Sequence, residues 1–246
     1  MSVQAQLVGG EFWVTDPVSA RLCWQSLMGF GKGNLSRSRP VYGELVRGAV
    51  DHVHLGRALR SLVRAGHFAA RTDKEDVEHL HLAPFEAAYL AFDEQFLTVK
   101  GFENTQSLWT YFVSLPKEHL RQYAVYRAYR HAGWAPHSGC KYGADFVLYR
   151  FRASEGRHSH APYAVLVRSA NERIHQRWIA VQNQLRLTKQ VAKRLVYVEV
   201  SMSTAMEHLQ HRERWLQTVC LHEVLVDRWT PSIRTRSKEA KQRAAK

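Results

Sequence analysis

The spacing of hydrophobic residues in the second half of the chain switches between helical and strand-like periods. One apolar stripe with helical spacing predicts a helix that begins near Pro116 and runs to Gly133. The residues of this stripe are Leu120, Tyr123, Ala124 and Ala128. A turn is predicted next, at 135–139. Apolar runs then predict strands at 144–151 and 163–168, and a long stretch with helical spacing predicts a helix at 172–194. A strand at 195–202, a polar segment at 203–218 and a last strand at 219–229 complete the predicted order.

The first half of the chain also predicts both strands and helices, from shorter apolar patterns. Short apolar runs predict strands at 5–8, 11–14 and 96–99, and a loop rich in Gly and Ser follows at 29–38. Helical spacing predicts one helix at 44–65, stopped by Gly66, and a second helix that begins at Pro84.

These elements predict an α/β (α+β) protein with two domains. We expect a small N-terminal α+β domain at 1–117 and a nuclease-like domain at 118–232, in which helices flank a mixed central sheet. Residues 233–246 are too polar and basic to join a core and are predicted to form a flexible tail.

Charge separates the two halves more sharply than hydrophobicity does. Residues 1–118 carry 12 Lys and Arg against 13 Asp and Glu, whereas residues 119–246 carry 23 against 9. A solvated basic face or tail is the simplest explanation of any one cluster. An excess of this size favours a polyanionic partner, and nucleic acid more than a membrane.

Composition also indicates a compartment. No apolar run approaches the roughly 20 residues that cross a bilayer, and a polar stretch follows Met1, so we expect a soluble intracellular protein. The three cysteines are widely spaced and odd in number, which argues against a disulfide framework or a CxxC zinc site.

Topology brings three protonatable side chains to one edge of the predicted sheet. If 144–151 and 163–168 pair as an antiparallel hairpin, Tyr149 and His160 become neighbours. The helix then returns the chain so that the next strand runs parallel to 163–168, and Lys193 lies just before that strand. Each residue alone is more simply explained by packing, solvation or the helix dipole. Together they indicate a site.

A basic domain that presents Tyr, His and Lys suits cleavage of RNA by the 2′-hydroxyl, without a metal or another cofactor. The reaction needs a base for that hydroxyl, an acid for the departing 5′-oxygen, and a positive charge for the phosphate oxygens. His160 suits the acid and Lys193 the charge. Tyr149 is a base only as phenolate, and we expect the nearby lysine to lower its pKa.

Several segments resemble the catalytic subunits of the tRNA-splicing endonuclease, most closely the Sen2 type. The stretches that carry the resemblance lie in the family's order and cover most of residues 119–230: YAVYRAYRHAGW, SGCKYGADFVLYR, HAPYAVLV, LRLTKQVAKRLVYVEV and LHEVLVDRW. A weaker likeness to the family's small N-terminal domain covers 82–99.

The resemblance implies roles for these residues. Tyr149 is the general base, His160 the general acid and Lys193 the stabiliser of the transition state, and the products carry a 2′,3′-cyclic phosphate and a 5′-hydroxyl. Arg186 and Trp229 correspond to a cation–π pair that sandwiches a base. The expected substrate is a precursor tRNA cut at the 5′ splice site, and the expected partners are Sen34-, Sen54- and Sen15-like subunits or a second copy of the chain. We expect nuclear localisation, with the cytoplasm as the alternative.

Two other functions stay open at this stage. A non-catalytic RNA-binding or scaffold subunit would keep the basic surface without needing the three residues. A metal-dependent DNA nuclease would need a carboxylate pair, for which Asp145 and Glu199 are the candidates, although Asp145 is more simply a structural strand residue. We expect no metal site at the three histidine pairs, because no second pair of ligands completes a tetrahedral set; they are His52/His54, His79/His81 and His158/His160.

Overall fold

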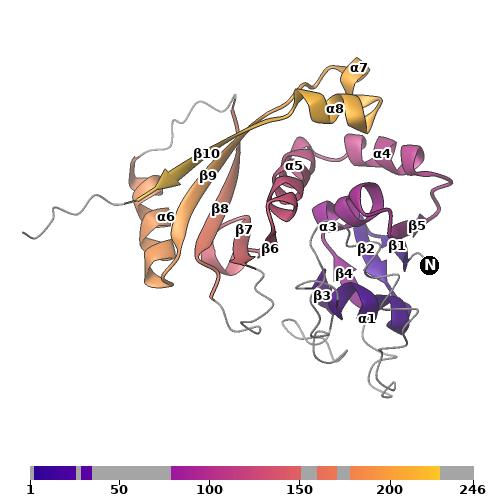
Figure 1. The fold of residues 1–246 in the computed structure, drawn as a ribbon, viewed down its shortest axis with the longest axis horizontal. Helices are drawn as coiled ribbons and strands as arrows, with labels where there is room; N and C mark the ends of the chain where they lie inside the picture. The colour runs from indigo at the N-terminus through magenta and orange to yellow at the C-terminus, as the bar shows by residue number, and fades with distance from the viewer. Residues whose placement is uncertain (1–2, 26–28, 35–78, 151–159, 171–177, 228–246) are drawn as a thin grey trace, which may run out of the picture.

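The computed structural model describes residues 3–25, 29–34, 79–150, 160–170 and 178–227. These residues form two five-stranded sheets, with helix α5 (Lys117–His131) between them (Figure 1). The predicted mixed α/β class is confirmed. None of the described helices is long and apolar enough to span a bilayer.

The N-terminal sheet has the strand order β3-β4-β2-β1-β5. Its strands are β1 (Val3–Val8), β2 (Glu11–Val14), β3 (Lys32–Gly33), β4 (Leu80–Leu82) and β5 (Leu97–Lys100). The three strands expected in this half are confirmed as β1, β2 and β5. The sheet is accompanied by α1 (Pro17–Gln25), α3 (Pro84–Ala88), the π-helical turn η2 (Tyr89–Asp93) and α4 (Thr105–Ser114). The helix expected at Pro84 is therefore present, and the one expected at 44–65 lies outside the described residues.

The second sheet has the order β10-β9-β8-β7-β6. Its strands are β6 (Trp134–Ser138), β7 (Phe146–Arg150), β8 (Tyr163–Ser169), β9 (Arg194–Ser201) and β10 (Cys220–Val226). β7 and β8 pair antiparallel, and α6 (Trp178–Gln190) carries the chain back so that β9 runs parallel to β8. Both pairings expected from the sequence are confirmed. Antiparallel β10 completes a mixed sheet.

The turn expected at 135–139 is wrong, because most of this segment is strand β6, which pairs antiparallel with β7. The pairing puts Pro136 opposite Leu148. Proline has no N–H to donate and suggested a turn, but β6 is an edge strand, where one missing donor is tolerated. The chain turns only at Gly139, where a Cβ would lie 2.8 Å from the Ala144 carbonyl oxygen.

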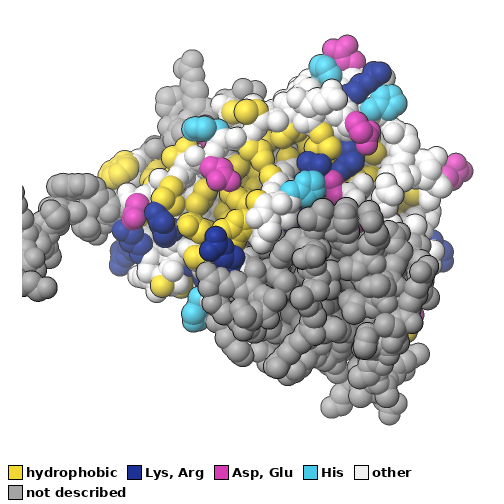
Figure 2. All heavy atoms as spheres, viewed as in Figure 1, with side chains coloured by type: hydrophobic (Ala, Val, Ile, Leu, Met, Phe, Trp, Pro, Cys, Tyr) yellow, Lys and Arg dark blue, Asp and Glu magenta, His cyan; other side chains and the backbone are white. Residues whose placement is uncertain are grey.

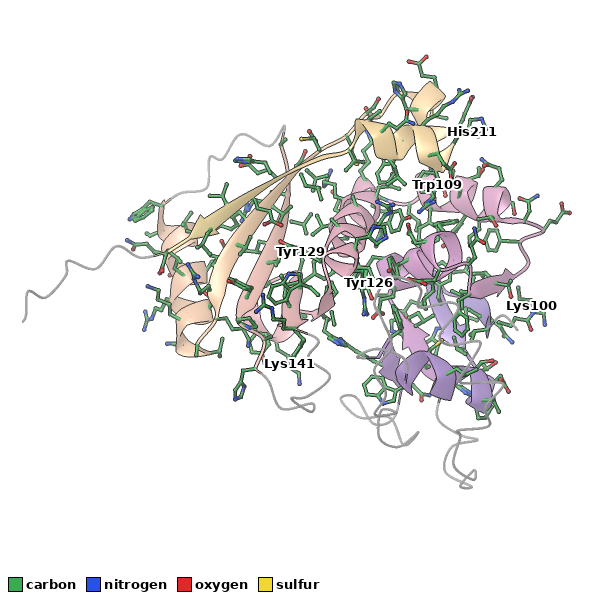
Figure 3. The ribbon with its side chains drawn as sticks, viewed as in Figure 1. Lys100, Trp109, Tyr126, Tyr129, Lys141 and His211 are labelled. Atoms are coloured by element: carbon green, nitrogen blue, oxygen red, sulfur yellow. The ribbon has the colours of Figure 1, made fainter. Side chains whose placement is uncertain are left out.

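Two short helices lie in the segment 203–218, which the sequence marked only as polar: α7 (Met206–Leu209) and α8 (Arg212–Thr218). Trp215 of α8 is completely buried, and its ring lies 5.4 Å from that of Trp109, on α4. The Trp109 indole N–H donates to the Leu209 carbonyl at 2.8 Å. These short helices thus pack on the helices of the first half, as the position of Trp109 in Figure 3 shows.

One hydrophobic cluster joins the two halves of the protein. It contains Val3 and Phe12 of the first sheet, Tyr126 of α5, and Phe146 and Val198 of the second sheet. The predicted boundary at 117 falls at the start of α5, whose buried side chains belong to this cluster. The division into domains at 1–117 and 118–232 stays a prediction, and the tail at 233–246 lies outside the described residues.

A buried carboxylate ties α5 and α8 to the end of the first half. Asp93, 6% exposed, accepts hydrogen bonds from the Tyr123 hydroxyl and from Arg127 Nε, both at 2.7 Å, and from Arg212 Nη2. Arg212 Nε also donates to the Tyr123 hydroxyl at 2.7 Å. The four residues form one network drawn from three elements.

Removing the charge of Asp93 should therefore cost stability. We expect Asp93→Asn to lower the free energy of unfolding by about 3 kcal/mol, because two guanidinium groups lose their buried counter-charge. Glu118→Gln is the matched control: Glu118 pairs with Arg121 at 2.6 Å but is 63% exposed, so the expected loss is below about 1 kcal/mol. Urea unfolding of both variants measures the difference, and equal losses would contradict the prediction.

Candidate active site

The strand register places the ends of three segments at the same edge of the second sheet. Tyr163, the first residue of β8, pairs with Leu148 of β7 on one side and with Arg194 of β9 on the other. Tyr149 and Lys193 are the next residues outward on the two neighbouring strands. Because side chains alternate between the faces of a sheet, these two lie on the face opposite Leu148 and Arg194. The topology expected from the sequence is therefore present.

Lys193 is held from two directions just after α6. Its backbone N–H donates to the Thr188 carbonyl at 2.9 Å across a left-handed residue, Ala192, with φ of 53°. Its ammonium Nζ donates to the Ala161 carbonyl at 2.8 Å, and the residue is only 7% exposed. Burial lowers the pKa of Lys193 from its ordinary value. Among the described residues, no carboxylate lies within ion-pair distance of this ammonium.

Tyr149 is half-buried on the same face of the sheet. With Tyr142 it packs against a small cluster made of Ala144, Val147, Ala161 and Ala164. The ring of His137, on β6, meets the Tyr149 ring edge-on at 5.3 Å. Burial, and then the neighbouring Tyr142, raise the pKa of Tyr149. The lower pKa expected from a nearby lysine is thus wrong, because loss of water raises the pKa of this phenol.

His160 is exposed and lies one residue before Ala161. Ala161 joins the parts of the site, because its carbonyl accepts from Lys193 and its side chain packs in the cluster that includes Tyr149. The segments that carry Tyr149, His160 and Lys193 therefore meet at one residue. His158 lies outside the described residues.

The predicted base-stacking pair is only half described. Arg186 is exposed on α6, and Trp229 lies outside the described residues, so the pair stays a prediction. The sequence analysis assigned no part to Tyr142, although it lies in the KYG stretch that helped to carry the resemblance. It also assigned none to His137, which it had placed in a turn.

The two carboxylates considered for a metal-dependent nuclease, Asp145 and Glu199, contact other groups of the protein. Asp145 Oδ2 accepts from the Val167 N–H at 2.8 Å, and Oδ1 accepts from Gln122 Nε2 at 3.2 Å. Glu199 lies 3.7 Å from His222 Nδ1 on the neighbouring strand. These contacts favour the structural interpretation of Asp145. Across the described part of the chain, no three His, Cys, Asp or Glu side chains gather as metal ligands.

Positive side chains surround this edge of the sheet. Lys141, Arg150, Lys189 and Arg194 are all exposed, and Figure 3 places Lys141 where β6 and β7 are joined. A cavity of about 260 Å³ lies between the end of α6 and the end of β10, and its lining includes Lys189, Lys193, Arg194 and Asp227. Asp227 pairs with Lys189 at 2.9 Å, so three cations and one carboxylate line the cavity, a positive balance that favours phosphate groups.

A mixed sheet flanked by helices, with Tyr, His and Lys at one basic edge, defines an α/β nuclease-like domain. The family described as tRNA intron endonuclease, catalytic C-terminal domain, matches residues 119–207. The tRNA-splicing endonuclease subunit Sen2-1 of Arabidopsis thaliana is 29% identical over 166 residues, 65% of this chain and 68% of that protein. The subunit SEN2 of Eremothecium gossypii is 31% identical over 163 residues, 63% of this chain and 44% of that protein.

The tRNA-splicing endonuclease of Methanothermobacter thermautotrophicus is 34% identical over 117 residues, which are 47% of this chain and 67% of that protein. The chain belongs to the tRNA-splicing endonuclease family. The matched regions span between 44% and 68% of these three relatives.

Proposed function

We propose that this chain is a catalytic subunit of a tRNA-splicing endonuclease and cuts precursor tRNA at an intron boundary, the 5′ splice site. The observation that supports this most strongly is the buried ammonium of Lys193, which donates to the residue that follows His160 and, among the described residues, has no carboxylate within ion-pair distance. A buried cation without a counter-charge is costly for the fold alone, and an RNA phosphate would supply the missing charge.

The proposed reaction is an attack by the 2′-hydroxyl beside the scissile phosphate. Tyr149 accepts the proton of that hydroxyl as the new bond from oxygen to phosphorus forms. The bond from phosphorus to the 5′-oxygen breaks, and His160 donates a proton to that oxygen. Lys193 stabilises the negative charge on the phosphate oxygens. The products are a 2′,3′-cyclic phosphate and a 5′-hydroxyl.

The raised pKa of Tyr149 limits how this base works. At neutral pH only a small fraction of the residue is phenolate, so the proposed proton transfer to Tyr149 depends on that fraction. Arg186 and Trp229 are proposed to hold a base near the cut by stacking.

Assembly is proposed to use strand β10. Among the described strands, β10 pairs with β9 alone, and it exposes Val224 and Leu225. Figure 2 shows hydrophobic side chains over the strands β8 to β10. An apolar sheet edge of this kind recruits another strand. We propose Sen34-, Sen54- or Sen15-like subunits or a second copy of this chain as the partner, and the nucleus as the site of action.

Mapping the ends of the products tests this function. The full chain, alone and with candidate partner subunits, is incubated with an intron-containing precursor tRNA in the presence of EDTA. We expect cleavage at the intron boundary with no loss of rate, because the proposed acid, base and cation are all side chains. Products that end in a 3′-hydroxyl and 5′-phosphate, or cleavage that returns only with added Mg²⁺, would contradict the proposal.

A further inference from the structure

Tyr142 lies on a short, well-fixed turn between β6 and β7. The turn is the 3₁₀ helix η3 (Cys140–Tyr142), and the Tyr142 N–H donates to the Gly139 carbonyl at 2.7 Å. Gly139 in turn donates to the Asp145 carbonyl at 2.9 Å, and Gly143 ends the turn with φ of 64°. The backbone that carries the Tyr142 ring is therefore anchored on both sides.

The Tyr142 ring faces the ammonium of Lys193. Nζ lies 4.9 Å from the ring centroid, within the distance of roughly 6 Å at which an aromatic face attracts a cation. A second contact of this ammonium is its hydrogen bond to the Ala161 carbonyl, at 2.8 Å. A lysine side chain has several rotatable bonds, and these two contacts hold its end in one place.

Tyr142 also shares a packing site with Tyr149. Both rings lie against Ala144, Val147, Ala161 and Ala164, and Tyr142 contributes to the raised pKa of Tyr149. One residue thus touches the ammonium and packs in the same cluster as the phenol. Nothing in the catalytic roles described above uses Tyr142.

We propose that Tyr142 is a positioning residue for RNA cleavage, whose ring holds the ammonium of Lys193 at the sheet edge beside Tyr149 and His160. The inference rests on the proposed function and adds a residue to it. The ring face provides the attraction, because its π electrons carry partial negative charge. The hydroxyl of Tyr142 is not needed for this purpose.

Two substitutions separate the ring from the hydroxyl. Both variants are tested in single-turnover cleavage of precursor tRNA by the full chain in its active assembly. The cleavage rate of Tyr142→Phe should stay within about twofold of that of the unaltered chain, because phenylalanine keeps the aromatic face. Tyr142→Leu should lower the maximal cleavage rate by about tenfold while the RNA concentration for half-maximal rate stays within about twofold. Tyr111→Leu is the matched control, since Tyr111 is also a partly buried tyrosine but packs on the first sheet against Phe102 and Phe112.

A double-mutant cycle with Lys193→Met shows whether the ring acts through the ammonium. In the Lys193→Met background, we expect Tyr142→Leu to lower the cleavage rate by less than about twofold, because the cation that the ring positions is absent. An unchanged rate for Tyr142→Leu, an equal loss for Tyr142→Phe, or an undiminished loss in the Lys193→Met background would each overturn the inference. Full cleavage by Lys193→Met itself would instead overturn the proposed role of the lysine, so the two failures are distinguishable. Thermal unfolding of each variant identifies a rate lost through misfolding.

Discussion

Replacing His160 by alanine is expected to slow cleavage of precursor tRNA by about 10²–10⁴-fold, the range typical of removing one general acid. Without the imidazole, the 5′-oxygen must leave as an unprotonated alkoxide. RNA binding should survive, because phosphate contacts dominate affinity and the exposed cations around the site are untouched. The variant should also fold normally, since His160 is exposed. Single-turnover kinetics and a binding titration at the same salt concentration measure the two effects separately.

His211→Ala provides the matched control for this experiment. His211 is also exposed, but it lies just before α8, next to α7 and away from the sheet edge that holds Lys193 (Figure 3). We expect its cleavage rate to match that of the unaltered chain. If His160→Ala cleaved equally well, the chain would be better explained as an RNA-binding or scaffold subunit.

A single 2′-deoxy nucleotide immediately 5′ of the scissile phosphate is expected to abolish cleavage at that position. The 2′-oxygen is the proposed nucleophile, so its removal takes away a reactant rather than a contact. The affinity for the tRNA should change little, because binding depends on many phosphates and on the folded shape. Gel analysis of end-labelled substrate, with binding measured in parallel, tests both statements.

The control substrate carries the same 2′-deoxy substitution one nucleotide further away. It should be cut at the normal rate, which shows that the substitution does not disturb the fold of the RNA. Continued cutting of the first substrate would refute attack by the 2′-hydroxyl. An activated water would then be the nucleophile to test.

The sequence predicted the central part of the fold because each strand there is a continuous apolar run. The runs that became β7, β8 and β9 each contain consecutive buried residues, which lie on both faces of the sheet. The helical stretch between β8 and β9 returns the chain so that the two strands run parallel. Strand β6 was missed because Pro136, His137 and Ser138 resemble a turn. Helices α7 and α8 were missed because each short polar helix contains a single buried residue, Leu209 in α7 and Trp215 in α8.

Topology predicted where the candidate site lies, but the electrostatics of its residues depend on burial. Tyr149, His160 and Lys193 could be placed at one edge from strand order alone. The pKa of Tyr149 moves opposite to the expected direction because desolvation depends on which side chains cover it. The contact of Lys193 with Tyr142 and Ala161 likewise arises from three separate segments, and no local pattern records it.

The two edges of the second sheet are chemically unequal, and this limits how far an assembly can grow. β6, at one edge, carries Pro136, which has no N–H for an incoming strand. β10, at the other edge, contains no proline over Cys220–Val226, so none of its residues lacks an N–H. If two chains join through β10, each uses up its receptive edge, and the joined sheet presents a proline-bearing strand at both ends. Within this sheet, such an assembly has no second β10 edge through which a further chain could join.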